Sequence, residues 1–374
     1  MARYTLPTVN DLHDLEVPQE YAISIYAETS PAPDEREASF LNAKSAFDRA
    51  IRQLREGGAR HSTEAALRER FAEVADDEAW TRLSRSLAIF LAPERAEAFV
   101  LPNALENQMQ VGSYFDVGQL VRAVTTPQAA YALTLSANGW NLWEATATTT
   151  AAEMTLLDDH DADAAEANNR STIRGRKHVN RLAGDEGKKV LLETYAKRVA
   201  ESVNAELGHV DPGAERPLFL FATGPLLDMY RGIDEKRRII AIHGSPDELR
   251  ADEIDSAIRE HLSTINATHT SALVDQIGDG TSAGLVAKDV VDISRAAIAG
   301  AVSTLIYNFT VDIVGTIDDS SGDVTFTDDG YDLLSRIAMT VLDHGGEVIA
   351  VRPEEVTSSL WNQTAIARLR YALS

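Results

Sequence analysis

The sequence predicts an α/β protein of three domains, with domain limits near residues 114 and 263. Its 374 residues exceed the size at which a single hydrophobic core usually stops growing. Two hairpin signals, and runs in which helices alternate with strands, supply the order of elements. The expected domains are an N-terminal α/β domain (1–114), a middle domain with a mixed sheet (115–263) and a small third α/β sandwich domain (264–374).

The first domain is expected to contain a strand, two helices and a hairpin. Tyr21–Ala27 alternates large apolar residues with smaller ones, which is typical of a strand. The first helix carries an apolar face from Phe40 to Leu54 and stops at a pair of glycines, and the second covers Thr63–Val74. The hairpin strands are expected at Ser86–Leu91 and Ala96–Leu101.

The middle domain opens with the clearest hairpin signal in the chain. Asn138-Gly139 separates Ala130–Ser136 from Trp140–Thr146, and both turn residues tolerate the positive φ of a tight turn. A long polar segment, Leu157–Gly187, comes next. A helix, two strands and a helix complete the domain, at Lys188–Leu207, Pro217–Ala222, Arg238–His243 and from about Ser245 to Leu262.

The third domain is predicted to alternate helices with strands. Helices are expected at Ala287–Ala301 and Tyr331–Leu342, the second ending at Gly345-Gly346. The acidic segment Asp318–Asp329 has the composition of a turn. Strands are expected at Val302–Phe309, Val311–Ile317, Glu347–Val351 and Ala365–Leu373.

Composition bounds the class of protein. The formal net charge of −23 opposes non-specific adhesion to nucleic acid, so we expect no DNA partner and only local RNA contacts. The chain has no Cys, which excludes disulfides and thiolate metal sites. Its apolar runs are too short to span a bilayer, and its first residues lack the pattern of a signal peptide. We therefore expect a cytoplasmic protein with no membrane partner, and the sequence leaves its oligomeric state open.

No segment carries a recognisable catalytic, cofactor or metal motif. The acidic run Asp158–Asp163 lacks the glycine and the bidentate glutamate of a calcium loop, so a solvated loop is the favoured interpretation. His261 and His269 are expected at a helix end and in the loop that follows, without the spacing of metal ligands. The sequence therefore predicts no catalytic residue, no cofactor and no metal site.

One basic segment departs from the acidic background. Residues 170–198 hold nine Lys and Arg residues against three acids, a local charge of +6. A basic helix face that offsets acidic neighbours would explain this charge, and so would a loop and helix that contact phosphates. The candidate RNA-binding residues are Arg170, Arg174, Arg176, Lys177, Arg181, Lys188 and Lys189.

Three stretches resemble a known family. They are the two hairpins, Ser86–Pro102 and Tyr131–Thr146, and the C-terminal end, which comprises Gly345–Val356 and Thr364–Leu373. Together they are similar to the bacterial and archaeal relatives of the archaeo-eukaryotic class-1 peptide-chain release factors, which include Pelota. The resemblance implies a ribonuclease-H-like middle domain and a third domain like the L7Ae and L30e ribosomal proteins. It also implies a ribosome, ribosomal RNA or tRNA partner.

The resemblance fails at the catalytic tripeptide. Family release factors carry Gly-Gly-Gln in the loop that corresponds to Leu157–Gly187, and these 374 residues contain no Gly-Gly-Gln. The resemblance therefore implies a translation factor that does not release peptide. Two alternatives stay open. One is a ribonuclease-H-like nuclease, for which the candidate strands offer only Glu144. The other is a protein-interaction module without an RNA partner.

Overall fold

Strands build four sheets in the part of the chain that the computed structural model describes, and the fold is of the mixed α/β class. That part comprises residues 2–3, 7–30, 32, 34–75, 80, 83–126, 128–146, 150–156, 185–233, 237–327 and 330–372. The chain separates into two compact units. The first unit is formed by Met1–Pro127 with His261–Ser374, and the second by Gln128–Glu260. The domain limits near residues 114 and 263 stay a prediction.

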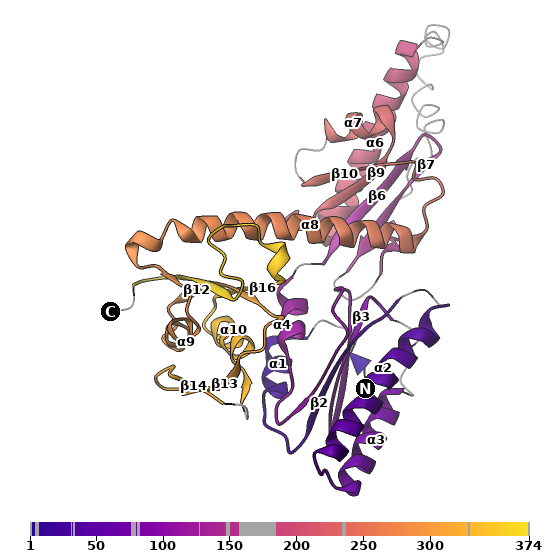
Figure 1. Ribbon diagram of the computed structural model, residues 1–374. Helices are drawn as coiled ribbons and strands as arrows, with labels where there is room; N and C mark the ends of the chain where they lie inside the picture. Colours follow the sequence, from indigo (N-terminus) through magenta and orange to yellow (C-terminus); the bar gives the residue numbers. More distant parts are fainter. Residues whose placement is uncertain are drawn as a thin grey trace. The chain divides into compact units, whose positions relative to one another are not determined.

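The N-terminal sheet of the first unit has five strands. Its elements are β1 (Ala2–Arg3), β2 (Ala22–Glu28), β3 (Ser86–Ala92), β4 (Arg95–Leu101) and β5 (Gln108–Gly112), with helices α1 (Val9–Leu15), α2 (Arg36–Glu56) and α3 (His61–Ala75). The strand order is β1-β4-β3-β2-β5, antiparallel except for β1 beside β4. Helices α2 and α3 cover one face (Figure 1), where Phe47 stacks on Phe71 at a centroid distance of 4.2 Å.

The C-terminal part of the first unit is built on a four-stranded sheet. Its elements are β11 (Val286–Ala287), α9 (Val290–Ile298), β12 (Val302–Asn308), α10 (Leu333–Asp343), β16 (Glu347–Val351) and β17 (Ala365–Leu369). The strand order is β11-β17-β12-β16, with β12 parallel to β16 and antiparallel to β17. A small sheet has the order β14-β13-β15, formed by Val324–Phe326, Val314–Ile317 and Tyr331–Asp332.

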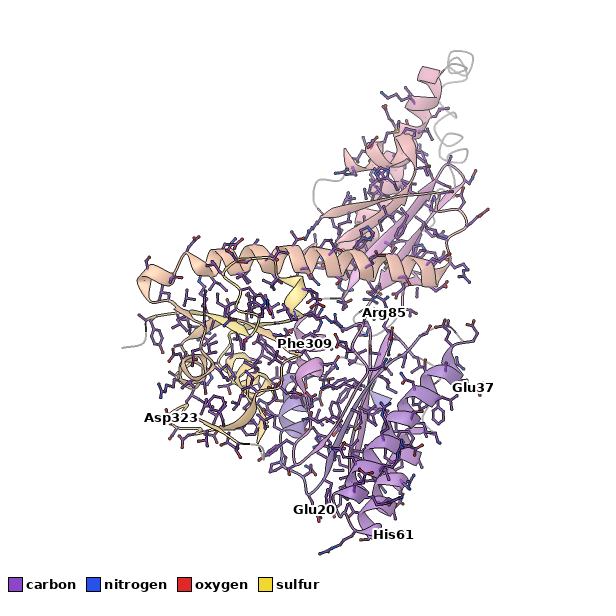
Figure 2. All side chains as sticks on the ribbon, in the orientation of Figure 1. Glu20, Glu37, His61, Arg85, Phe309 and Asp323 are labelled. Atoms are coloured by element: carbon purple, nitrogen blue, oxygen red, sulfur yellow. The ribbon has the colours of Figure 1, made fainter. Side chains whose placement is uncertain are left out.

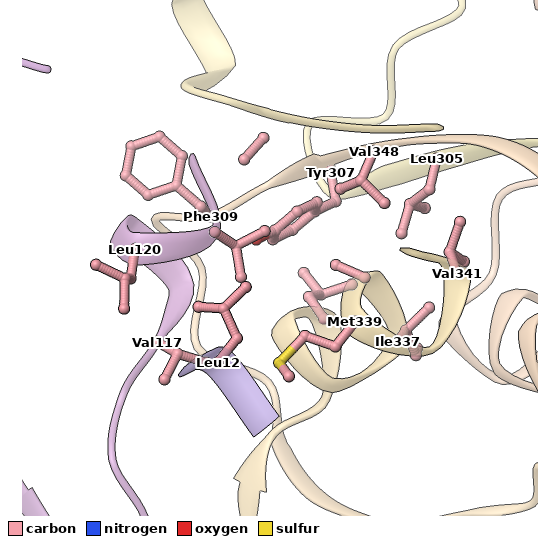
Figure 3. Close-up of a cluster of buried hydrophobic side chains, with 14 of the residues drawn as sticks. Leu12, Val117, Leu120, Leu305, Tyr307, Phe309, Ile337, Met339, Val341 and Val348 are labelled. Atoms are coloured by element: carbon pink, nitrogen blue, oxygen red, sulfur yellow. The ribbon is translucent and has the colours of Figure 1, made fainter. Parts of the chain in front are cut away.

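One apolar core joins these two parts of the first unit, which are far apart in sequence (Figure 3). It contains Leu12 of α1, Leu120 of α4 (Gly118–Thr125), Leu305 and Tyr307 of β12, and Met339 of α10. None of these five side chains is more than 1 % exposed. Because burial of apolar surface is the main favourable term in folding, this shared core makes the two parts one folding body.

A buried ion pair reinforces this core. Arg122 of α4 donates to both carboxylate oxygens of Glu355, at 2.6 and 2.8 Å, and to the carbonyl of Ala350 at 2.8 Å. Burial alone would raise the pKa of Glu355, but the hydrogen bonds from Arg122 outweigh it and hold that pKa below its usual value. The guanidinium carbons of Arg122 and Arg352 lie 5.0 and 5.6 Å from the ring centroid of Phe309, which is labelled in Figure 2.

Buried carboxyl groups are a second polar feature of the first unit. Asp116 accepts a hydrogen bond from Gln108 Nε2 at 2.7 Å and another from the backbone N–H two residues on, at 3.0 Å. Burial, together with the charges of Asp332 and Asp312, raises the pKa of Asp116 to about 7. Asp332 accepts from two N–H groups of the first turn of α10, and burial raises its pKa to about 6. Both groups therefore hold protons near neutral pH more readily than exposed aspartates do.

The residues after β17 close both helices of the C-terminal part. Arg370 donates to the carbonyl of Gly300, just beyond α9, at 2.9 Å, and to the carbonyl of His344, just beyond α10, at 3.0 Å. The hydroxyl of Tyr371 donates to the carbonyl of Ala299 at 3.0 Å. Cations near helix C-termini satisfy carbonyls that lack a partner within the helix. The Arg-Tyr end therefore has a structural role.

Replacing Arg370 by alanine is expected to lower the free energy of unfolding by about 1–2 kcal/mol, because charge-assisted hydrogen bonds to both helix ends are lost. Arg368 supplies a matched control, since it is exposed on β17, two residues before Arg370. Arg368→Ala should change the stability by less than about 0.5 kcal/mol. Urea unfolding of the two variants checks the expectation, and equal stabilities would show that the contacts of Arg370 contribute nothing.

The second unit contains one five-stranded sheet. Its elements are β6 (Ala130–Ser136), β7 (Gly139–Ala145), β8 (Ala152–Glu153), α6 (Asp185–Val210), β9 (Leu218–Ala222), α7 (Gly224–Arg231) and β10 (Ile239–His243). The strand order is β10-β9-β6-β7-β8. β6, β9 and β10 are parallel, whereas β7 and β8 are antiparallel to their neighbours. The antiparallel pairing of β6 with β7 confirms the predicted hairpin. Its turn residues are Ala137 and Asn138, one position earlier than predicted, because Gly139 pairs with Ser136 as the first residue of β7.

Helix α8 (Ala251–Gly278) is a single helix of 28 residues. The prediction that a helix ends near Leu262 is wrong, and so is the prediction that His269 lies in a loop. The misleading signal is the polar run 263–271, which lacks an apolar face. Inside the helix, hydroxyl groups of this run find hydrogen-bond acceptors on the helix itself. Those of Thr268 and Thr270 donate to carbonyls four residues earlier, both at 2.9 Å.

Among the residues described, no helix is long and apolar enough to cross a membrane.

Candidate nucleic-acid interface

The structure describes only the C-terminal end of the predicted basic interface. Arg170, Arg174, Arg176, Lys177 and Arg181 lie outside the described residues. Lys188 and Lys189 belong to the first turns of α6, and the side chain of Lys188 is not among those described. Lys189 is exposed, and its Nζ lies 3.9 Å from Glu193 Oε1. The assignment of these seven residues to RNA therefore stays a prediction.

Helix α6 is anchored by one apolar face. Tyr195, Val199, Val203 and Leu207 stand four residues apart, on one face of the helix, and are at most 2 % exposed. They pack in the core that α6 shares with α7 and with one face of the sheet. This packing gives the basic segment a rigid C-terminal support.

The exposed face of α6 alternates in charge. Lys189, Glu193, Lys197 and Glu201 are all exposed and stand four residues apart. Pairs of opposite charge at this spacing stabilise a helix, and their charges cancel, so this face has little net charge with which to attract phosphates. Phosphate contacts would therefore depend on the residues that precede Lys189 in the basic segment, where cations outnumber acids.

The N-terminal support of the basic segment is the short strand β8. Trp143 and Glu144 of β7 pair with Glu153 and Ala152, and the N–H of Met154 donates to the carbonyl of Leu142 at 2.8 Å. The chain therefore reaches residue 156 while still attached to the sheet. Both ends of the long polar segment are thus fixed to the same unit.

A buried ion pair on α8 holds the base of this hairpin. Arg259 donates to the carbonyls of Gln128 and Thr146, the second at 3.0 Å. Asp255 accepts from Arg259 at 3.2 Å and from the N–H of Ala151 at 2.9 Å. The side chains of Asp255 and Arg259 are 4 % and 1 % exposed. The pair therefore ties the segments before β6, after β7 and before β8 to one helix.

A second polar cluster lies at the amino ends of the parallel strands. Arg237 pairs with Asp211, and Arg216 Nη1 lies 2.7 Å from Glu144 Oε1. The two guanidinium carbons lie 5.5 and 5.4 Å from the ring centroid of Tyr131. Burial works to raise the pKa of Asp211, but the bond from Arg237 and the bonds from backbone N–H groups lower it below its usual value.

The structure describes no metal site. Within the described ranges, no three His, Asp or Glu side chains gather as metal ligands. His261 and His269 both lie on α8, eight residues apart, and the acidic run Asp158–Asp163 lies outside the described residues. Glu144, the carboxylate that the nuclease hypothesis requires, faces Arg216.

Comparison with known families gives a match that spans the second unit. Residues 127–268, which include the whole basic segment and both of its supports, match a family model of the archaeo-eukaryotic release factor class. Within that class they match the model described as bacterial archaeo-eukaryotic release factor family 11. This match covers 142 of the 374 residues and confirms, for that part of the chain, the resemblance seen in the sequence. No curated protein matches the chain.

Several solved structures are similar to the chain at low identity. Archaeoglobus fulgidus Pelota is 12 % identical, with 77 % of this chain and 80 % of that chain covered and a TM-score of 0.36. Saccharomyces cerevisiae Dom34, a translation termination-like factor, is 11 % identical, with coverages of 80 % and 77 % and a TM-score of 0.35. A chain in a model of ribosome-bound archaeal Pelota and ABCE1 is 10 % identical, with coverages of 100 % and 96 % and a TM-score of 0.40. Every one of these TM-scores is below 0.5, so the classification rests on the family match.

Sequence reasoning missed the Asp255–Arg259 pair. A carboxylate and a guanidinium four residues apart on a helix are the usual signature of an exposed ion pair. Nothing in the local pattern shows that both are buried, because the partners of Arg259 at residues 128 and 146 are more than 100 positions away. Only the tertiary structure distinguishes the two cases.

Proposed function

We propose that the protein is a cytoplasmic translation factor that binds the ribosome or its RNA through the basic segment and does not release peptide. The observation that carries this proposal is the family match, which spans the segment and both of its supports. The local charge of +6 in a chain of −23 supports an anionic partner at this place. The missing Gly-Gly-Gln supports the lack of peptide release.

The finer fold assignments belong to this proposal. The hairpin of β6 and β7, followed by parallel strands with helical connections, supports a ribonuclease-H-like second unit. The alternation of helices and strands around β12 supports an L7Ae-like third domain in residues 264–374. The three-domain division at residues 114 and 263 goes with these two assignments.

Reversing the charge of Arg174, Arg176, Lys177 and Arg181 to Glu is expected to reduce co-sedimentation with ribosomes by about tenfold or more at low salt. Each phosphate contact that is lost should also lower the salt slope of binding by about one unit. The melting temperature should stay nearly unchanged, because the proposal assigns these four cations to RNA and not to the protein's own core. Pelleting at low and at moderate salt measures both quantities.

A matched control uses four cations of α2 and the turn after it. Lys44, Arg49, Arg52 and Arg60 lie outside the basic segment, and their replacement by Glu changes the net charge of the protein by the same amount. If this control variant pellets as weakly as the test variant, net charge rather than the basic segment governs binding. If both variants pellet like the unmodified protein, the segment has no ribosomal partner and the proposal is overturned.

A further inference from the structure

A hollow lies beside the tip of the β6–β7 hairpin, at the carboxyl ends of the parallel strands. Its volume is about 540 Å³, and its walls include Thr134, Asn138 and Asn141 of the hairpin, Trp143 of β7, and Asp247 after β10. Ligands of open α/β sheets commonly bind at this edge of the sheet. Nothing in the family match or in the motif analysis assigns a ligand to this hollow.

The indole of Trp143 is held in place within the wall. Its Nε1 donates to Thr134 Oγ1 at 3.1 Å, and that hydroxyl in turn donates to the backbone carbonyl of Asn141 at 3.2 Å. The side chain of Trp143 is partly exposed, whereas Thr134 is buried. The indole nitrogen is thus already used, and what the ring offers to a ligand is stacking on its face.

Polar groups on the same wall remain available. Asn138 Nδ2 donates to Asp247 Oδ2 at 3.1 Å, which fixes the carboxylate against the hairpin tip. Within the described residues, Asp247 Oδ1 and the side-chain amide of Asn141 make no hydrogen bond. Both side chains are exposed. The hollow therefore combines one aromatic face with a free carboxylate oxygen and a free amide.

The charge of the wall restricts the ligand. No Lys, Arg or His lines the hollow among the described residues, so it does not suit a phosphate. A carboxylate accepts hydrogen bonds and favours a ring edge that presents N–H donors. Among the nucleobases, guanine presents two neighbouring donors on one edge, N1–H and the 2-amino group. Adenine, cytosine and uracil place acceptors beside their donors.

We propose that this hollow binds an unpaired guanine base. The base stacks on Trp143, its 2-amino edge donates to Asp247, and the Asn141 amide meets its remaining polar atoms. This inference deepens the proposed function, on which it rests for the source of the base, an unpaired nucleotide of RNA. Free guanosine carries the same ring, and the two sources are separated by experiment.

The test measures binding of guanosine, inosine and adenosine by equilibrium dialysis against the full chain. Inosine lacks only the 2-amino group of guanosine, so guanosine is expected to bind roughly tenfold more tightly. Asp247→Asn should abolish that difference. Trp143→Leu should weaken guanosine binding by roughly tenfold or more, and Trp143→Phe should retain most of it. The pentaribonucleotides AAGAA and AAAAA distinguish an RNA source, and AAGAA is expected to bind more tightly than both AAAAA and guanosine.

Equal binding of guanosine and inosine, or unchanged binding by Trp143→Leu, overturns the inference. If Trp143→Leu fails to fold, Asp247→Asn and Asn141→Ala decide, because both side chains are exposed. Tighter binding of guanosine than of AAGAA assigns the hollow to a free nucleoside and overturns the RNA source. Ribosome pelleting of Asp247→Asn separates this inference from the proposed function. If Asp247→Asn loses its selectivity for guanosine but still pellets with ribosomes, the two properties are distinct. If the unmodified protein selects guanosine but does not pellet, only the ribosomal proposal is refuted.

Discussion

Replacing Glu355 by alanine is expected to destabilise the first unit by about 3–5 kcal/mol, because it leaves Arg122 buried without its charge partner. The side chains of Arg122 and Glu355 are only 9 % and 16 % exposed. Arg352, which lies 3.5 Å from Glu355, also loses a partner. Urea unfolding at neutral pH measures the loss, and it should exceed that of any exposed substitution described above.

A double variant controls for the cost of burying charge. Combining Glu355→Leu with Arg122→Met removes both charges, so its stability should lie well above that of Glu355→Ala alone. If Glu355→Ala loses less than about 1 kcal/mol, the pair behaves as an exposed salt bridge. The bonds between α4 and the residues after β16 would then contribute little to the unit.

Lowering the pH from about 8 to about 5 is expected to stabilise the first unit, in contrast to the usual behaviour of buried ion pairs. The pKa of Asp116 is raised to about 7 and that of Asp332 to about 6, from 3.8 for both. Between these values the folded state holds protons that the unfolded chain has released, so stability falls as pH rises through the folded pKa. Each pH unit below the folded pKa corresponds to about 1.4 kcal/mol, so Asp116 alone contributes about 2–3 kcal/mol between pH 7 and pH 5.

Asp116→Asn is expected to remove most of the dependence of stability on pH. Asp332→Asn is expected to remove the part of that dependence near and below pH 6, because the pKa of Asp332 is about 6. The slope of stability against pH is the readout, rather than the stability itself. In Asp116→Asn, the amide N–H donors of the new side chain can face Gln108 Nε2, which is also a donor. This clash of donors would lower the stability by the same amount at every pH. Urea unfolding at intervals across this pH range supplies the slopes. Parallel curves for the unmodified protein and Asp116→Asn would show that this carboxyl group is not the source of the dependence.

The elements that the sequence predicted well have local causes. The hairpin of β6 and β7, the apolar face of α2 and the continuous apolar strand β9 depend on spacing and turn chemistry within a few residues. The short strand β5 and helices α4 and α7 were not expected. In α4, Gln119 and Arg122 are buried beside apolar residues, so the helix lacks a polar face. Their partners lie at Gln108 and Glu355, which no local pattern reveals.

The features of the candidate interface also fall into two groups, those with local causes and those that depend on long-range contacts. The excess of positive charge in residues 170–198 is a property of the sequence, and the support by α6 follows from its apolar periodicity. The hairpin support β8 and the Asp255–Arg259 pair depend on long-range contacts. The hollow beside Trp143 needs the hairpin register, which sets Asn141 opposite Thr134, and the approach of the loop after β10. Sequence alone supplies the hairpin but places its turn one residue too late, so neither the register nor the approach of the loop could be predicted.

The central position of β17 in its sheet determines when the first unit can be completed during synthesis. β17 lies between β11 and β12, although every other described strand of the two units precedes it in the chain. The second unit is one continuous segment, Gln128–Glu260, so all of its contacts are available before residues 261–374 are made. The nascent chain therefore carries a complete second unit while the core that Leu12 and Leu120 share with β12 and α10 is still unfinished. During synthesis from the N-terminus, the second unit can therefore complete its folding before the first.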